Sequence, residues 1–362
     1  MSKPDESYQV KKSKLMLYTL VALVLLTAVS SLAWWPTSII LAIISVFVAV
    51  SLDYLFSLFM KNKGPLNTCS AAVFGLIVAL SYTLTSPSSY YVGTYLSSSY
   101  LPELLPTQAP MAYVYVAAIS AVGMCLFKKA QGLLKRKYVN PAAAAKILVF
   151  LPFLGDVLAN DAHAVSIALT GPIGYNINIA GPNVLYESFG SLLYVCLGNV
   201  QHSIPLHLVT PSNVFEALTL LKYHGWVGGA SSVAVILVGI GFFIVARRWI
   251  KWRITVSYMA ALVLMALVMY GVYGGDLVLR VGFELFIGSS IFLAFFMATD
   301  PATTPQKYIG QVVFGLGLGV LTVLIQMYMN FLGGSILALV IMNLTSPLLD
   351  RLGTGRTQMS LS

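Results

Sequence analysis

One carboxylate of this chain stands inside an apolar run, where it could take part in moving an ion. Asp53 lies about two helical turns from the end of the stretch 37–59, which contains no other charged residue. A charged side chain at membrane depth is costly, so it is a functional candidate by default. Asp53 is therefore a candidate member of an ion path. A local ion pair with Lys61 or Lys63 explains it equally well, and both interpretations stay open.

Three further acidic residues have simpler explanations. Glu284 and Asp156 fall near the ends of apolar runs, where we expect water to reach them. Asp300 precedes Pro301, and capping the turn that follows accounts for it.

The residues that usually bind metals do not cluster. The three cysteines stand far apart in the chain, at Cys69, Cys125 and Cys196. All four histidines fall in the segment 158–225, and His202 and His207 share no helical face. Because metal sites use close ligand spacings, we predict no metal site.

The composition places these residues in a membrane protein. Hydrophobic residues make up 58% of the chain and charged residues only 9%. A helix needs about 20 apolar residues to cross a bilayer. Ten runs approach that length: 15–34, 37–59, 69–84, 111–127, 142–157, 226–245, 254–272, 281–298, 309–329 and 333–349. We therefore predict an all-α, polytopic membrane protein with about ten transmembrane helices, of which the short third and fifth are candidates for broken, tilted or re-entrant segments.

The basic residues predict the orientation. With ten spans, 18 of the 21 Lys and Arg residues fall on one side, while Lys222 and Arg280 fall on the other. Lys146 lies one turn inside the fifth run, from which its side chain can snorkel to the basic side. Because Lys and Arg collect in cytoplasmic loops, we expect both termini in the cytoplasm of a cell (inner or plasma) membrane protein. The net charge of +9 is then an orientation signal, and no nucleic-acid partner is expected.

The segment 158–225 divides the runs into five before it and five after it. We expect repeats at 1–157 and 226–350, an extracytoplasmic region at 158–225 and a cytoplasmic tail at 351–362. An odd number of helices per half makes any internal repeat an inverted one. SAAVFGLIVALSYTLTSP (70–87) and GSSIFLAFFMATDPATTP (288–305) form a weak echo of this kind. The predicted architecture is therefore two inverted five-helix repeats.

Four segments resemble the membrane subunits RnfD and NqrB of the Rnf and sodium-pumping NADH:quinone oxidoreductase complexes. They are VNPAAAA (139–145), RRWIKWRITVSY (247–258), FFMATDPATTP with KYIGQVVFGLGLG (295–319), and LVIMNLTSPLLD (339–350). Asp53 falls where that family tends to carry an acidic residue. The resemblance implies a subunit of an ion-translocating oxidoreductase that works with other Rnf-type subunits within membrane lipid and couples electron passage to Na⁺ or H⁺ transport.

The resemblance also implies flavin cofactors. It implies FMN attached through its phosphate to a threonine, often with riboflavin nearby, and cofactor-binding roles for Asn140, Thr299 and Asp300. Thr210 keeps the Thr-Pro of the family motif but lacks the upstream acid and hydroxyl, and Thr170 is an alternative that needs one inserted residue. Thr-Pro and Thr-Gly are also ordinary turn dipeptides. The alternative that neither threonine carries a flavin therefore stays open. The competing hypothesis is an inverted-repeat membrane transporter or channel without a redox role.

Overall fold

Most of the apolar runs form helices in the computed structural model, which describes residues 6–59, 68–84, 111–130, 138–151, 219–220, 225–273, 277–286, 290–328 and 334–352. Before the long segment 158–225, the helices are α1 (Glu6–Trp34), α2 (Thr37–Phe59), α3 (Thr68–Leu80), α5 (Met111–Val122) and α7 (Pro141–Val149). The π-helix η2 (Gly123–Ala130) continues α5.

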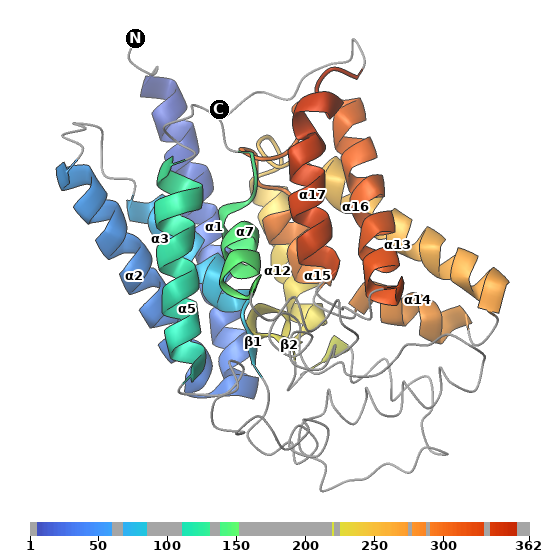
Figure 1. Cartoon of the computed structure of the whole chain (residues 1–362), viewed down its shortest axis with the longest axis horizontal. Helices are drawn as coiled ribbons and strands as arrows, with labels where there is room; N and C mark the ends of the chain where they lie inside the picture. The colour runs from blue at the N-terminus through green and yellow to red at the C-terminus, as the bar shows by residue number, and fades with distance from the viewer. Residues whose placement is uncertain are drawn as a thin grey trace, which may run out of the picture.

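After that segment, the helices are α12 (Ser232–Val245), α13 (Trp252–Tyr273), α14 (Leu277–Phe286), α15 (Ser290–Phe292), α16 (Tyr308–Tyr328) and α17 (Gly334–Leu349). The short 3₁₀ turn η4 (Val227–Gly229) precedes α12, and the π-helix η6 (Leu293–Met297) continues α15. Figure 1 shows the start of α1 and the end of α17 at the same end of the molecule.

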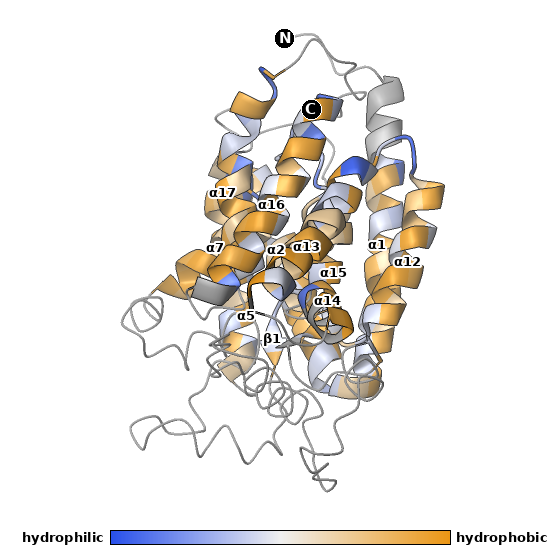
Figure 2. Ribbon diagram, turned by 90° about the vertical axis from the view of Figure 1, so that its right-hand side faces the viewer, coloured by the Kyte–Doolittle hydropathy of each residue, from blue (hydrophilic) through white to orange (hydrophobic). Residues whose placement is uncertain are grey.

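The helices have the length and surface of membrane spans. Five described segments are long and apolar enough to cross a bilayer: Ser13–Trp34, Thr37–Phe59, Met111–Ala130, Trp252–Val272 and Tyr308–Gln326. Large apolar side chains such as Phe47 and Leu237 are exposed on the outside, and hydrophobic residues cover much of the helical surface in Figure 2. Because water disfavours so large an apolar surface, the predicted all-α polytopic membrane fold is confirmed. The arrangement as two inverted five-helix repeats stays a prediction.

Three of the predicted spans are not single helices in the described part of the chain. One is the run 226–245, which begins with a strand residue and the turn η4 before α12. The run predicted at 69–84 forms α3 only to Leu80, after which the chain turns into the strand β1 (Thr83–Leu84). The run predicted at 281–298 is divided between α14 and the α15–η6 segment. Hydropathy averaged over the length of a span cannot locate such ends, because apolar residues such as Leu84 continue beyond the break. Non-helical backbone is tolerated at this depth only where the protein itself covers it.

A two-stranded sheet joins the parts of the chain on either side of the long segment. Strand β1 pairs antiparallel with β2 (Gly225–Trp226), with Thr83 opposite Trp226. The Val227 amide donates to the Tyr82 carbonyl over 2.9 Å, and the Ser30 hydroxyl donates to the Val227 carbonyl over 2.6 Å. These bonds satisfy the backbone groups beyond the end of α3, and they fix the first half against the second.

Small residues let α13 and α16 approach closely. A Cβ atom on Gly315 would lie 1.9 Å from the Ser257 hydroxyl oxygen and 2.6 Å from the Ile254 carbonyl oxygen. On Gly319 it would lie 2.5 Å from the Ala261 Cβ. Glycines four residues apart face the same neighbour, and such pairs allow close helix packing in membranes.

Candidate cofactor site between the two halves

A cavity opens where helices from both halves of the chain meet. It is partly open to the surroundings and has a volume of about 120 Å³. The lining comes from the start of α1, from α3, η2 and the start of α7, and from α12, η6 and the loops around them. Its residues are Leu15, Met16, Thr19, Ser70, Val73, Phe74, Ile77, Lys128, Asn140, Pro141, Ala142, Phe242, Trp249, Ile250, Phe296, Thr299, Asp300 and Pro301. Three residues predicted to bind a cofactor, Asn140, Thr299 and Asp300, therefore share one cavity.

Asn140 joins the two halves at this cavity. Its side-chain oxygen accepts hydrogen bonds from the amides of Ala142 at 3.0 Å and Ala143 at 3.3 Å, which caps the N-terminus of α7. Pro141 suits the first helical position, because its missing N–H would be unpaired there in any case. The Asn140 amide nitrogen donates to the carbonyl of Met297, the last residue of η6, over 3.3 Å. Its side chain therefore positions the cavity wall.

Asp300 folds the loop that closes the cavity. Its carboxylate accepts hydrogen bonds from the Ala302 amide at 3.2 Å and the Thr303 hydroxyl at 3.1 Å. The Thr299 hydroxyl donates back to the Phe295 carbonyl over 2.8 Å. The structure thus shows the turn-capping contacts expected from the sequence, and a role in cofactor binding stays a prediction.

A buried lysine holds the same loop in place. The Lys251 ammonium donates to the carbonyls of Pro301 at 3.0 Å and Thr304 at 2.8 Å, and to the Thr304 hydroxyl at 2.9 Å. Burial lowers the pKa of Lys251 to about 8, although the nearby carboxylates of Asp300 and Asp350 favour the charged form. Hydrogen bonds from the buried Lys251 ammonium therefore hold the loop in place.

Aromatic rings form the cavity's apolar walls. The Phe242 and Phe296 rings stack with centroids 5.8 Å apart and planes 15° apart. Across the cavity the Lys128 ammonium lies 5.4 Å from the centre of the Phe74 ring and donates to the Ser70 carbonyl over 2.7 Å. The cavity thus combines flat apolar walls with a cation and hydrogen-bonding groups, a combination that suits a planar, partly polar ligand.

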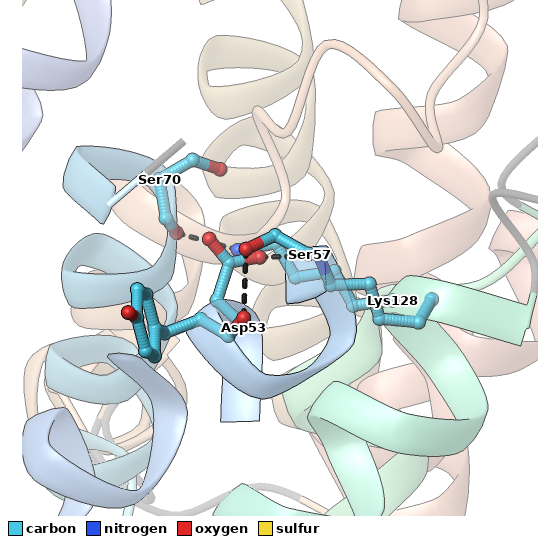
Figure 3. Close-up of polar contacts among 6 residues, drawn as sticks. Asp53, Ser57, Ser70 and Lys128 are labelled. Carbon is cyan, nitrogen blue, oxygen red and sulfur yellow. Dashed lines mark hydrogen bonds and ion pairs between the residues drawn. The ribbon is translucent and has the colours of Figure 1, made fainter. Parts of the chain in front are cut away.

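Asp53 lies in a different place, beside the cavity. Its buried carboxylate forms an ion pair with Lys129 of η2 and lines a separate cleft with Val50, Ser51, Tyr54 and Thr68. Figure 3 shows Asp53 among Ser57, Ser70 and Lys128. The observed partner is thus a residue of another helix, which the sequence analysis did not name. Lys61 and Lys63 lie outside the described residues.

Two expectations about ionisable residues were wrong. Lys146 does not snorkel to the surface: it is 1% exposed, donates to the Ser81 carbonyl just beyond α3, and lies 4.8 Å from the centre of the Trp226 ring. Glu284 is 5% exposed, so the water contact expected for it is missing in the folded chain. In both cases a neighbouring helix or strand, invisible in the local sequence, covers the side chain. Thr210, Thr170 and Asp156 lie outside the described residues.

Comparison with known proteins identifies the family of this chain. Residues 90–358 match the model of the NQR2, RnfD, RnfE family. The chain belongs to this family. The match covers most of the chain, including the described residues of the cavity after residue 110. The family resemblance of the Asn-Pro-Ala and Thr-Asp-Pro segments is therefore confirmed.

Individual relatives agree with this membership, and three of them are D subunits of ion-translocating complexes. The chain is 26% identical to that of the proton-translocating ferredoxin:NAD⁺ oxidoreductase complex of Clostridium ljungdahlii, over 74% of this chain and 73% of the relative. It is 24% identical to that of the Na⁺-translocating ferredoxin:NAD⁺ oxidoreductase complex of Acetobacterium woodii, over 94% of this chain and 88% of the relative. It is 27% identical to that of the ion-translocating oxidoreductase complex of Ectopseudomonas mendocina, over 78% of this chain and 81% of the relative.

Several residues that build the cavity or pair with Asp53 were not predicted from the sequence. Lys128 and Lys129 counted only as orientation charges, and Phe242 and Phe296 only as parts of apolar runs. The two lysines that follow the run 111–127 could have predicted the partner of Asp53, because a carboxylate at similar depth in another helix needs a cation near it. No sequence signal distinguishes the two phenylalanines from those that face lipid.

Proposed function

We propose that this chain is the flavin-carrying membrane subunit of an Rnf-type ion-translocating oxidoreductase complex. Family membership supports this proposal, as do the relatives named as D subunits of such complexes. The observation that carries the flavin part is the cavity between the halves. We place the protein in the cell membrane with both termini cytoplasmic, and we expect the other subunits of the complex to bind it, because a single carrier needs electron donors and acceptors.

The cavity residues fit a flavin. The cavity is partly open, and its lining combines apolar rings with a few polar groups, as small-molecule sites do. Phe74, Phe242 and Phe296 would contact the ring system, and Lys128 would compensate negative charge on it. A bound flavin supplies transfer of one or two electrons. The residues of this chain orient it, shield it from water and keep the Thr299–Pro301 loop rigid beside it.

A second flavin would lie on the other side of the membrane. We assign covalent FMN to Thr210, with Thr170 as the alternative. Both belong to the segment 158–225, which we place on the extracytoplasmic side of the membrane. The cavity is lined by the start of α1 and by Lys128, on the side that the basic residues mark as cytoplasmic. A non-covalent flavin, riboflavin or FMN, in the cavity and a covalent one outside would together let electrons cross the membrane.

We place Asp53 in the ion path. Its carboxylate is buried at the edge of a cleft, and its partner Lys129 remains 26% exposed. A cation that reaches Asp53 would displace the ammonium, and the exposed side of Lys129 gives that group somewhere to go. The relatives are named for protons in one case and Na⁺ in another, so the proposal covers either ion.

The first test measures flavin on the full chain purified from its native host. After denaturation, in-gel ultraviolet fluorescence and peptide mass mapping of residues 158–225 detect covalent flavin, while fluorescence of the supernatant measures flavin released from non-covalent sites. We expect a flavin mass on Thr210 or Thr170 and about one released flavin per chain. An unmodified segment together with an empty supernatant would refute the flavin proposal and leave the transporter or channel hypothesis.

A pair of variants tests the cavity itself. Phe242→Leu removes the ring stacked on Phe296, and Phe47→Leu makes the same change on an exposed surface of α2. Aromatic stacking contributes about 0.5 to 1.5 kcal/mol, so we expect Phe242→Leu to bind the released flavin about fivefold more weakly. Phe47→Leu should bind it as the natural chain does. Equal flavin content in all three proteins would place the flavin elsewhere.

A further inference from the structure

The arginine at the start of α13 has an unusual setting. The Cζ atom of Arg253 lies 3.8 Å from the centre of the Tyr308 ring and 4.8 Å from that of Trp252. Such contacts engage the flat face of a guanidinium, whereas its five N–H groups point outward in its plane. Within the described part of the chain, Arg253 forms no ion pair with a carboxylate. The arginine is thus held in place with its donors available.

The two rings mark the depth of this arginine in the membrane. Trp252 and Tyr308 are the first residues of two long apolar spans, Trp252–Val272 and Tyr308–Gln326. Trp and Tyr prefer the boundary between hydrocarbon and headgroups, so Arg253 lies at the level of the lipid phosphates. The spans are neighbours, because Gly315 of α16 packs on Ile254 and Ser257 of α13.

The surface inward of Arg253 suits acyl chains. One turn along α13, Val256 is 56% exposed, and on α16 Ile309 is 50% and Val312 39% exposed. These side chains continue from the arginine into the hydrocarbon layer. A ligand that follows them needs an anionic head and an apolar tail.

The net charge around Arg253 favours an anion. Arg247 and Arg248 are exposed in the loop that leads into α13. The two carboxylates that act on the neighbouring Lys251 are engaged within the protein: Asp300 folds its own turn, and Asp350 accepts the Gln306 amide at 2.7 Å. The exposed charge at this site is therefore positive.

We propose that Arg253, between Trp252 and Tyr308, binds the phosphate of an anionic phospholipid whose acyl chains lie along α13 and α16. Arginine suits this role better than lysine, since its planar fork can donate two parallel hydrogen bonds to one phosphate. The site is independent of the flavin cavity. It gives the protein a preference for the anionic lipids that surround it.

Native mass spectrometry of the full chain in detergent tests this proposal. The protein is mixed with equal amounts of phosphatidylglycerol and phosphatidylcholine, and the number of each lipid retained is measured. Both lipids carry a phosphate, but the choline cation of phosphatidylcholine opposes the charge of Arg253, whereas phosphatidylglycerol keeps a net negative charge. We therefore expect phosphatidylglycerol to be retained about tenfold more than phosphatidylcholine. Equal retention of the two lipids would refute the site.

Three variants separate a built site from general attraction. Arg253→Met should abolish the preference, and Arg253→Lys should keep only part of it. Arg247→Met removes the same charge from the loop that precedes α13, at a residue for which no ring contact is observed, and it should weaken the preference about twofold at most. Equal losses in Arg253→Met and Arg247→Met would show unspecific attraction and overturn the proposal.

Two controls complete the test. The unfolding temperature of each variant in detergent shows whether it is folded, and Arg253→Lys preserves a testable protein if Arg253→Met does not fold. Excess inorganic phosphate should leave phosphatidylglycerol bound, because the acyl chains contribute to binding. Displacement by phosphate would show a site for free anions and would contradict the lipid assignment.

Discussion

The two halves of the chain each bury a charge beside the central cavity, and they do so by different means. In the first half, Asp53 is paired with Lys129, whose side chain is 26% exposed. In the second half, Lys251 is enclosed by three oxygen atoms of the 301–304 turn. An ion pair with one exposed member can open, because water can take over the solvation of the departing charge. A cation enclosed by carbonyl groups of a rigid turn cannot. The proposed ion path thus has a cationic partner that can move away, whereas the wall of the proposed cofactor cavity is fixed.

The rigidity of the second half rests first on the close contact between α13 and α16. Gly315→Val would place a side chain against the Ile254 carbonyl and the Ser257 hydroxyl. Overpacking typically costs 1 to 3 kcal/mol, and backbone cannot yield as a side chain does, so we expect a loss of about 3 kcal/mol. Helicity during titration with sodium dodecyl sulfate measures it. Gly241→Val, with nothing within 4 Å of its Cβ, is the control, and equal effects in both would refute the packing argument.

The enclosed lysine should make stability depend on pH. The folded chain loses the Lys251 proton near pH 8, whereas the unfolded chain loses it near its ordinary pKa of 10.5. Between these values the unfolded state binds more protons, so stability rises with pH across this window and the charged lysine costs stability below it. We expect a rise on the order of 2 kcal/mol in detergent titrations. Lys251→Met should lack this rise, and a rise of the same size in that variant would assign the effect to another group.

The ion pair of the first half should be weaker. A double-mutant cycle with Asp53→Asn and Lys129→Met should give a coupling free energy of about 1 kcal/mol, because the exposed side of Lys129 is screened by water. In the assembled complex, Asp53→Asn should reduce ion transport much more than flavin content. A coupling of about 3 kcal/mol or more would instead indicate a fixed structural pair, like the enclosed lysine.

The smallest effect concerns one hydroxyl of the rigid turn. Thr304→Val removes the hydrogen bond to the Asp300 carbonyl, 2.6 Å long, and one acceptor of Lys251. We expect a loss of about 1 kcal/mol of unfolding free energy. Thr345→Val removes a hydroxyl that donates to the Met342 carbonyl within α17, and it should cost less. Equal losses would mean that the turn is no more constrained than a helix surface.

The sequence was sufficient for the class of fold. Apolar runs such as 37–59 and 254–272 correspond to α2 and α13 within a few residues, because a bilayer imposes a length and a hydrophobicity that are local properties of the chain. Asn140 was named through the family resemblance alone, and its capping of α7 is a finding of the structure. The family resemblance likewise rests on contiguous segments.

The tertiary structure alone decided where α3 ends, which cation pairs with Asp53, and how Lys146 is covered. Each depends on residues distant in the chain: Trp226 pairs with the strand after α3, Lys129 comes from another helix, and the Ser81 carbonyl accepts the hydrogen bond of Lys146. The cavity is of the same kind, because it exists only where Phe74 and Asn140 of one half meet Phe242 and Thr299 of the other. Hydropathy reports the solvent that a segment prefers, whereas a buried charge or a binding site is defined by its neighbours in space.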